Sequence, residues 1–147
     1  MLTRKTKYAL RALSQLARAK PDQPVLIADL AVSARVPKKF LERILLDLNR
    51  RGILRSRKGR GGGYLLNRAP EDISIAEVVR LMDGPLAPVS CVSQTAYSRC
   101  IECPDERHCG IRAIMHVVRD AIADVLEHAT LADLVKAERT GHYRPHR

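Results

Sequence analysis

Four cysteines gather in one short segment of the chain. They are Cys91, Cys100, Cys103 and Cys109, all within 19 residues of a 147-residue sequence. Thiolates are soft ligands, and four of them can hold a zinc ion or an iron–sulfur cluster, or can exchange disulfides. In a reducing cytosol, structural disulfides explain such a group poorly. The segment is therefore predicted to be a metal or redox site.

The spacing of the cysteines leaves these chemistries open. Cys100 and Cys103 have the two-residue gap of a zinc knuckle, and four sulfurs can close a tetrahedron around zinc. Against zinc, the sequence has no second Cys-x2-Cys pair. His108 is expected to be solvated, and His116 is not expected to be a ligand. From spacing alone, zinc and a cluster stay open, with a metal-free thiol switch as a third reading.

The charge of the chain is concentrated in its first half. Residues 1–70 hold 17 Lys and Arg against 4 Asp and Glu, a net charge of +13, whereas residues 71–147 carry a net charge of −3. Such an excess favours a phosphate backbone or an anionic membrane surface as partner, although a basic face can also serve solubility.

No apolar run approaches the ~20 residues of a bilayer span, and no signal peptide is recognised, so a cytoplasmic protein without membrane contact is expected.

Helical periodicity dominates the first half of the sequence. A helix is expected over residues 3–19, a short second helix over 27–36, and a third between Pro37 and Gly52. The third helix has an apolar face and carries basic residues elsewhere. Two short helices joined by a tight turn, with basic residues at the start of the second, are typical of a helix-turn-helix, whose second helix enters the major groove of DNA.

A β-hairpin is expected directly after the third helix. Residues 53–57 alternate like a strand, residues 58–63 form a basic, glycine-rich tip, and residues 64–67 return. A nucleotide-binding P-loop would need a Lys and a Ser or Thr that open a helix, whereas Gly63 is followed by Tyr64 and a strand. The hairpin is therefore interpreted as a wing, and these residues are predicted to contact DNA: Lys38, Lys39, Arg43, Arg55, Arg57, Lys58, Arg60 and Tyr64.

The second half is expected to hold a fourth helix over residues 75–82, a loop, a long helix and a short helix over 131–137. The long helix starts after Gly110 and carries an apolar stripe, which is interpreted as a dimer seam rather than monomer core. The stripe consists of Ile111, Ile114, Met115, Val118, Ile122, Val125 and Ala129.

The fold is thus expected to be mainly α with a small β-hairpin wing. Its predicted parts are a winged helix-turn-helix domain at 1–83, a cysteine-rich loop at 84–109, the dimerisation helix and short helix at 110–138, and a tail at 139–147.

The sequence resembles the winged-helix regulators typified by the iron–sulfur cluster regulator IscR, the nitric oxide sensor NsrR and the iron regulator RirA. The likeness covers nearly the whole chain and is clearest in four segments: Tyr8–Leu13, Ile27–Ala31, Pro37–Glu42 and Arg60–Leu66. The resemblance implies a bacterial transcription regulator and not an enzyme. It would bind a pseudo-palindromic site on double-stranded DNA as a homodimer, and the state of an iron–sulfur cluster, 2Fe–2S or 4Fe–4S, would alter which sites are bound.

The resemblance also implies a set of ligands. Members that bind a cluster have three cysteines in this loop, and the carried-over spacing selects Cys91, Cys103 and Cys109. This chain has Arg112 where IscR-like proteins place a histidine ligand, and Lys7 where other members take an acidic ligand from the partner chain. Cys100 is therefore inferred to supply the fourth ligand or to stand beside an open iron site, and zinc remains the alternative metal.

Overall fold

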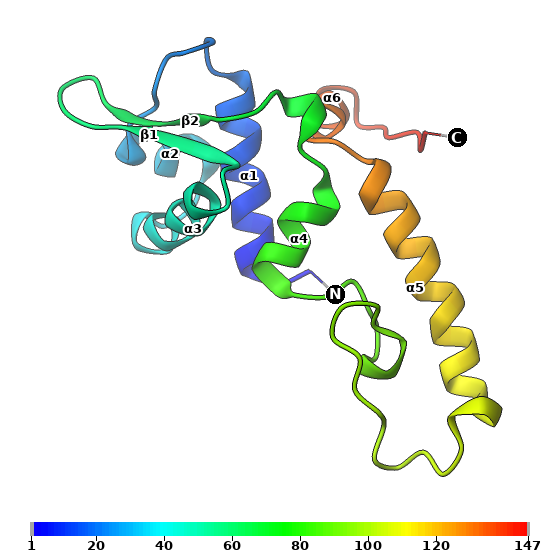
Figure 1. Ribbon diagram of the computed structural model, residues 1–147. Coiled ribbons are helices and arrows are strands. Elements are labelled where there is room, and N and C mark those ends of the chain that lie inside the picture. The colour runs from blue at the N-terminus through cyan, green and yellow to red at the C-terminus, as the bar shows by residue number, and fades with distance from the viewer. Residues whose placement is uncertain (1, 147) are drawn as a thin grey trace.

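Six α-helices and one antiparallel hairpin make up the described part of the chain, residues 2–146 of a computed structural model (Figure 1). The prediction of a mainly helical fold with a small wing is confirmed. The elements are α1 (Arg4–Arg18), α2 (Ile27–Ala34), α3 (Lys38–Arg50), β1 (Leu54–Arg57), β2 (Gly63–Leu66), α4 (Ile75–Asp83), α5 (Gly110–His128) and α6 (Leu131–Thr140), with short 3₁₀ turns η1 (Pro70–Asp72), η2 (Ser90–Val92) and η3 (Glu106–His108).

Side-chain caps set the start of three helices. The hydroxyls of Thr3, Ser74 and Thr130 accept hydrogen bonds from the backbone N–H three residues later, at the starts of α1, α4 and α6. Such caps satisfy N–H groups that have no partner inside the helix. At Thr130 the bond is reciprocal, because Asp133 accepts from the Thr130 N–H and completes a capping box.

The main aliphatic core joins helices α1, α2, α3 and α4 with α6. The apolar face of α3 is buried as its periodicity predicts, and Leu131 at the start of α6 is fully buried in the same core. Ser14 on α1 and Glu138 on α6 are hydrogen-bonded, and Arg18 pairs with the same carboxylate. The last helix therefore returns to the first and closes a unit of α1–α4, the hairpin and α6, which is called the reading domain after its predicted role.

The turn and the wing have distinct backbone conformations. Arg35 ends α2 in the left-handed region at φ +54°, which allows the sharp turn into α3. In the wing, Arg57 faces Gly63 across the β1–β2 pair, and Tyr64 also bridges to Val25 through two 2.9 Å backbone hydrogen bonds. A Cβ at Gly63 would lie 2.2 Å from the Val25 carbonyl oxygen, so this close approach requires glycine.

Helix α5 extends away from the reading domain as an arm, with the cysteine-rich loop at its far end (Figure 1). Much of its predicted apolar stripe is exposed: Ile111 and Ile114 are 71% and 63% exposed, and Val118, Ile122 and Val125 are exposed as well. Met115 is half-buried and Ala129 is buried against α4, so these two belong to the monomer rather than to a free face.

No helix within residues 2–146 has both the length and the apolarity that crossing a bilayer would need.

A carboxylate clamp joins the start of α1 to the end of α4. Asp83 accepts from the Thr3 backbone N–H at 3.0 Å and from the Thr3 hydroxyl. Burial raises the pKa of Asp83, but these hydrogen bonds outweigh burial and hold the pKa below its usual value. The clamp therefore stabilises the fold above the unfolded-state pKa, and this contribution is lost as pH falls through the lower folded-state pKa.

This clamp predicts a pH-dependent effect of Asp83→Asn. Because hydrogen bonds to a charged group are lost at a half-exposed site, we expect the substitution to lower the free energy of unfolding by about 1 kcal/mol at about pH 7. The difference from wild type should shrink at about pH 3, where the wild-type carboxyl is also being protonated. Urea unfolding at both pH values measures it. An equal difference at both would show that the charge of Asp83 plays no part.

Candidate DNA interface and cysteine site

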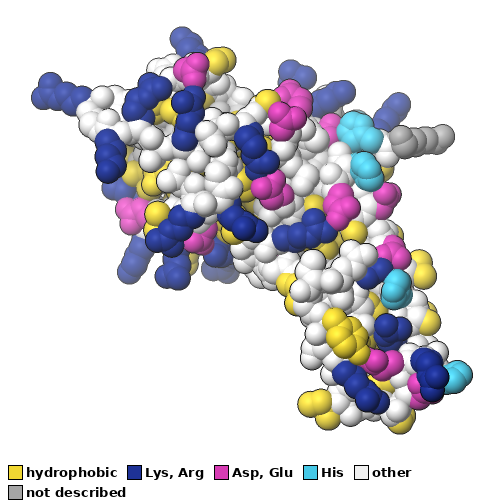
Figure 2. All heavy atoms as spheres, in the orientation of Figure 1, with side chains coloured by type: hydrophobic (Ala, Val, Ile, Leu, Met, Phe, Trp, Pro, Cys, Tyr) yellow, Lys and Arg dark blue, Asp and Glu magenta, His cyan; other side chains and the backbone are white. Residues whose placement is uncertain are grey.

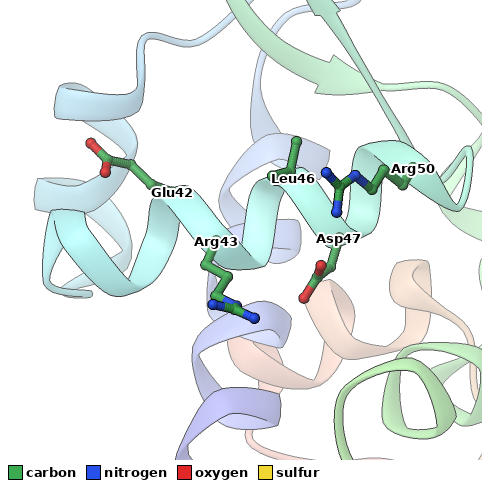
Figure 3. A pocket seen from close by; sticks show the side chains of 5 residues that line it. All are labelled: Glu42, Arg43, Leu46, Asp47 and Arg50. Carbon is green, nitrogen blue, oxygen red and sulfur yellow. The ribbon is translucent and has the colours of Figure 1, made fainter.

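Helix α3 presents its basic residues on the exposed side. Lys38, Lys39 and Arg43 are all exposed, whereas the opposite face is buried in the core. Further along the helix, Glu42, Arg43, Leu46, Asp47 and Arg50 line a shallow hollow of about 430 Å³ (Figure 3). Arg43 and Asp47 project from the same side of the helix in this view, and Asp47 is ion-paired with Lys5 of α1 at 3.0 Å. The predicted contact residues of α3 are thus placed on one accessible surface.

The four predicted cations of the wing form two groups that differ in their contacts. Arg55 is ion-paired with Asp22 at 2.6 Å, and Arg57 donates to the Asp22 backbone carbonyl at 3.4 Å. Lys58 and Arg60 are exposed at the glycine-rich tip. The Lys and Arg side chains gather over the reading domain rather than over the arm (Figure 2). The tip residues are therefore better placed to meet a phosphate backbone than the two paired arginines.

Two aromatic residues of the reading domain differ in exposure. Tyr64, predicted to contact DNA, is half-buried and packs against the core. Phe40, which is not among the predicted DNA contacts, is 61% exposed beside Lys39. Its ring centroid lies 6.3 Å from that of Tyr8. Its position in the sequence could have indicated this exposure, since Phe40 falls outside the apolar face of the third helix. An exposed phenylalanine can contact the methyl groups of thymine.

All four cysteines line one cavity of about 680 Å³ at the far end of the arm. Cys91 lies in η2 and is 9% exposed, Cys100 is exposed in the following loop, and Cys103 is half-buried. Cys109 caps the start of α5, where its sulfur accepts from the Arg112 backbone N–H at 3.4 Å. The cysteine-rich loop thus brings together every thiol that the sequence singled out.

Two of these thiols have shifted pKa values. The backbone N–H of Arg112 lowers the pKa of Cys109, as expected for a thiol at a helix N-terminus. Burial raises the pKa of Cys103, and its interaction with Cys109 raises it further. Cys109 is therefore the thiol of this pair that favours the thiolate, which is the form that binds metal.

The donor set suits an iron–sulfur cluster in its chemistry. Four thiols surround a single cavity, and thiolates are the usual ligands of such clusters. Between residues 2 and 146, no three His, Cys, Asp or Glu side chains are already gathered closely enough to hold a metal ion.

The histidines are engaged with nearby carboxylates. His108, which also lines the cavity, is exposed and hydrogen-bonded through Nδ1 to Asp105 at 2.6 Å. His116 lies 3.4 Å from Asp120 on the neighbouring turn of α5. Neither observation selects a histidine as the fourth ligand, so the prediction that Cys100 supplies that ligand or stands beside an open iron is unchanged.

A helix-turn-helix with an exposed basic second helix, followed by a hairpin with a basic tip, defines a winged helix-turn-helix protein. The chain belongs to the Rrf2 family of transcription regulators, since residues 2–137 match Rrf2, described as "Iron-dependent Transcriptional regulator". The predicted resemblance to regulators of the IscR and NsrR type is thereby confirmed.

Three known proteins illustrate the likeness. An rrf2-like HTH-type transcriptional regulator of Rhodobacter capsulatus is 45% identical over 140 residues, which cover 93% of each chain. The HTH-type transcriptional regulator NsrR of Bacillus licheniformis is 34% identical over 91% of each chain. Among solved structures, CymR, the global cysteine regulator of B. subtilis, superposes with a TM-score of 0.76 at 26% identity, covering 92% of this chain and 96% of that one. These relatives are named transcription regulators, and this chain is likewise a regulator and not an enzyme.

Proposed function

We propose that this chain binds operator DNA as a homodimer and that an iron–sulfur cluster held by its cysteines modulates the binding. The observation that carries the proposal is the single cavity lined by all four thiols at the end of α5. Cys91, Cys103 and Cys109 would hold the cluster, with Cys100 as fourth ligand or beside an open iron. When bound, such a group supplies a centre that responds to iron supply, redox state or nitric oxide.

The position of the loop suggests how this response would reach DNA. The loop follows α4, which packs on α1, and it precedes α5, whose exposed stripe would form the dimer seam. A change in loop order would therefore alter how the two reading domains are held relative to each other. Two recognition helices about 34–36 Å apart would read successive major grooves of a pseudo-palindromic site.

The composition of protein purified without oxygen tests the cluster. We expect brown protein with visible absorption and stoichiometric iron and sulfide. Colourless protein with about one zinc per chain would instead indicate a zinc-stapled DNA-binding dimer, since four thiolates satisfy a structural zinc site. Metal-free protein that forms a reversible disulfide under mild oxidant would indicate a thiol switch like that expected of a cysteine-based regulator.

The salt dependence of binding tests the DNA interface. If about four cations per subunit neutralise phosphates, log affinity should fall against log salt with a slope near −7, from about −0.9 per contact. Replacing both tip residues, Lys58→Ala with Arg60→Ala, should reduce the steepness by about 3 to 4, because a dimer loses four contacts. Fluorescence anisotropy with labelled operator measures both slopes.

The matched control for this experiment is the double variant Lys136→Ala with Arg139→Ala. Both side chains are exposed on α6, apart from α3 and the wing, so the same two charges are removed where no phosphate contact is proposed. Its slope should equal that of wild type. A wild-type slope of about −2 would contradict the assignment of the basic surface, since it corresponds to only about two phosphate contacts in the dimer.

A further inference from the structure

Arg119 is an anomaly on the otherwise open arm. It is 7% exposed, and among residues 2–146 it is the one charged side chain in the buried set. A buried guanidinium is costly unless its charge is paired and its N–H groups are hydrogen-bonded. Its Nε donates to the Asp120 carboxylate at 2.8 Å, which provides the charge partner. Burial here therefore reflects a specific set of contacts rather than chance packing.

Nη2 of Arg119 also lies 3.3 Å from Nδ1 of His116 on α5, whereas Nη1 reaches across to the cysteine-rich loop. This Nη1 donates to the Val92 carbonyl at 2.9 Å, a buried hydrogen bond that joins positions 27 residues apart. Two turns earlier on α5, Arg112 Nε donates to the Cys91 carbonyl at 3.3 Å. Two arginines on α5 thus bind two consecutive carbonyl groups of η2.

These carbonyls need an external donor because η2 is so short. Its own backbone bonds run from the N–H groups of Val92 and Ser93 to the carbonyls of Val89 and Ser90. The carbonyls of Cys91 and Val92 lie at the end of the turn, where a helical segment leaves acceptors without internal partners. Since Cys91, Val92 and Ser93 are all buried, leaving those acceptors unpaired would cost free energy.

We propose that Arg119, together with Arg112, is a positioning residue that clamps η2 onto α5 and so holds Cys91 at the cavity that Cys103 and Cys109 line. Cys91 precedes the nearest of the other thiols by nine residues. Within the described residues η2 makes no backbone hydrogen bond to α5, so the two arginines bring Cys91 there. They touch the backbone beside the thiol rather than the thiol itself. Where it concerns a cluster, this inference rests on the proposed function, but the clamp itself does not.

The first test uses cluster-free, reduced protein and follows alkylation of Cys91 by iodoacetamide, read by mass spectrometry after digestion. Arg119→Met should raise the rate at Cys91 by about tenfold, because loss of a charge-assisted hydrogen bond makes local opening of η2 easier. Arg119→Lys, which keeps the charge and one donor, should give an intermediate rate. The exposed Cys100 should react at the wild-type rate in both variants and serves as an internal reference.

The matched control is Arg80→Met. Arg80 joins α4 to α5 through its ion pair with Glu127 and, within the described residues, makes no hydrogen bond to η2. Its Cys91 rate should equal that of wild type. If Arg119→Met folds, as judged by circular dichroism, and Cys91 still reacts at the wild-type rate, the clamp does not exist. If Arg119→Met fails to fold, Arg112→Met decides the question by the same readout, with a smaller expected rise.

The second test uses protein reconstituted with iron and sulfide without oxygen. Arg119→Met should shift the visible circular dichroism of the cluster and should shorten its lifetime under a chelator, with partial rescue in Arg119→Lys. An unchanged spectrum and lifetime in Arg119→Met would contradict a role in positioning the ligand. If the wild-type chain takes up no cluster, the proposed function fails, and the alkylation rates still decide whether the clamp holds Cys91.

Discussion

Replacing Cys103 with alanine is expected to remove the visible absorption that the proposed cluster would give to anaerobically purified protein. Its helix content, thermal stability and proposed dimeric state should stay close to wild type. Cys103 lies at the same cavity as Cys91 and Cys109 and interacts with the Cys109 thiol, so its loss would remove a proposed ligand from the centre of the site. It is not part of the aliphatic core, so the reading domain should fold without it. Absorption spectra with iron and sulfide analysis measure the first effect, and circular dichroism with sedimentation measures the second.

Cys109 allows ligand loss to be separated from loss of a helix cap. Its sulfur accepts from the Arg112 N–H at the start of α5, so Cys109→Ala removes both functions and should cost about 1 kcal/mol of stability. Cys109→Ser keeps an acceptor at the cap position and should leave stability near wild type while still abolishing cluster binding. If either Cys103→Ala or Cys109→Ser unfolds the chain, the cysteines are structural, as in a zinc site.

The exposed Cys100 decides how the fourth ligand is assigned. If Cys100→Ala also loses the visible absorption, Cys100 is a ligand. If the absorption persists with altered reactivity toward small molecules, Cys100 stands beside an open iron instead. The sequence could not choose between these cases, because both are compatible with the Cys-x2-Cys spacing.

The sequence predicted those features of the fold that depend on local patterns. Thr3, Ser74 and Thr130 each place a hydroxyl directly before an apolar repeat, a local pattern typical of a helix start, and each caps its helix. The buried face of α3 and the hairpin around the glycine-rich tip likewise follow from periodicities of 3.6 and 2 residues. The short last helix runs to Thr140 rather than Ala137, because Gly141 provides the left-handed residue that ends it.

Contacts between distant parts of the chain could not be predicted in this way. The sequence does not predict the hydrogen bond between Glu138 and Ser14 or the ion pair between Asp22 and Arg55, since each depends on tertiary packing. The same holds for Arg119: on α5 it has the spacing of a solvated polar residue, and only the position of η2 makes it a buried one. The cysteines were found from their type, but their shared cavity depends on these longer-range contacts.

Charges placed on the α5 stripe are expected to convert the proposed dimer into a monomer. Operator binding should then weaken by at least about 100-fold, because simultaneous engagement of two half-sites raises affinity by about 10²–10⁴. The double variant Ile114→Asp with Ile122→Asp tests this. Both side chains are exposed in the single chain, so their replacement should hardly change the stability of the monomer. In a dimer seam they would instead bury carboxylates without partners, which is costly.

Sedimentation velocity and operator titrations by fluorescence anisotropy measure the two effects together. Ala113→Asp is the matched control, since Ala113 is exposed on α5 but lies outside the apolar stripe, and its carboxylate near the helix N-terminus should be well tolerated. This control should remain dimeric and bind operator like wild type. A double variant that sediments as a dimer would place the seam elsewhere on the molecule. The exposed stripe of α5 would then need another partner, because an apolar face of this length is rarely exposed to solvent.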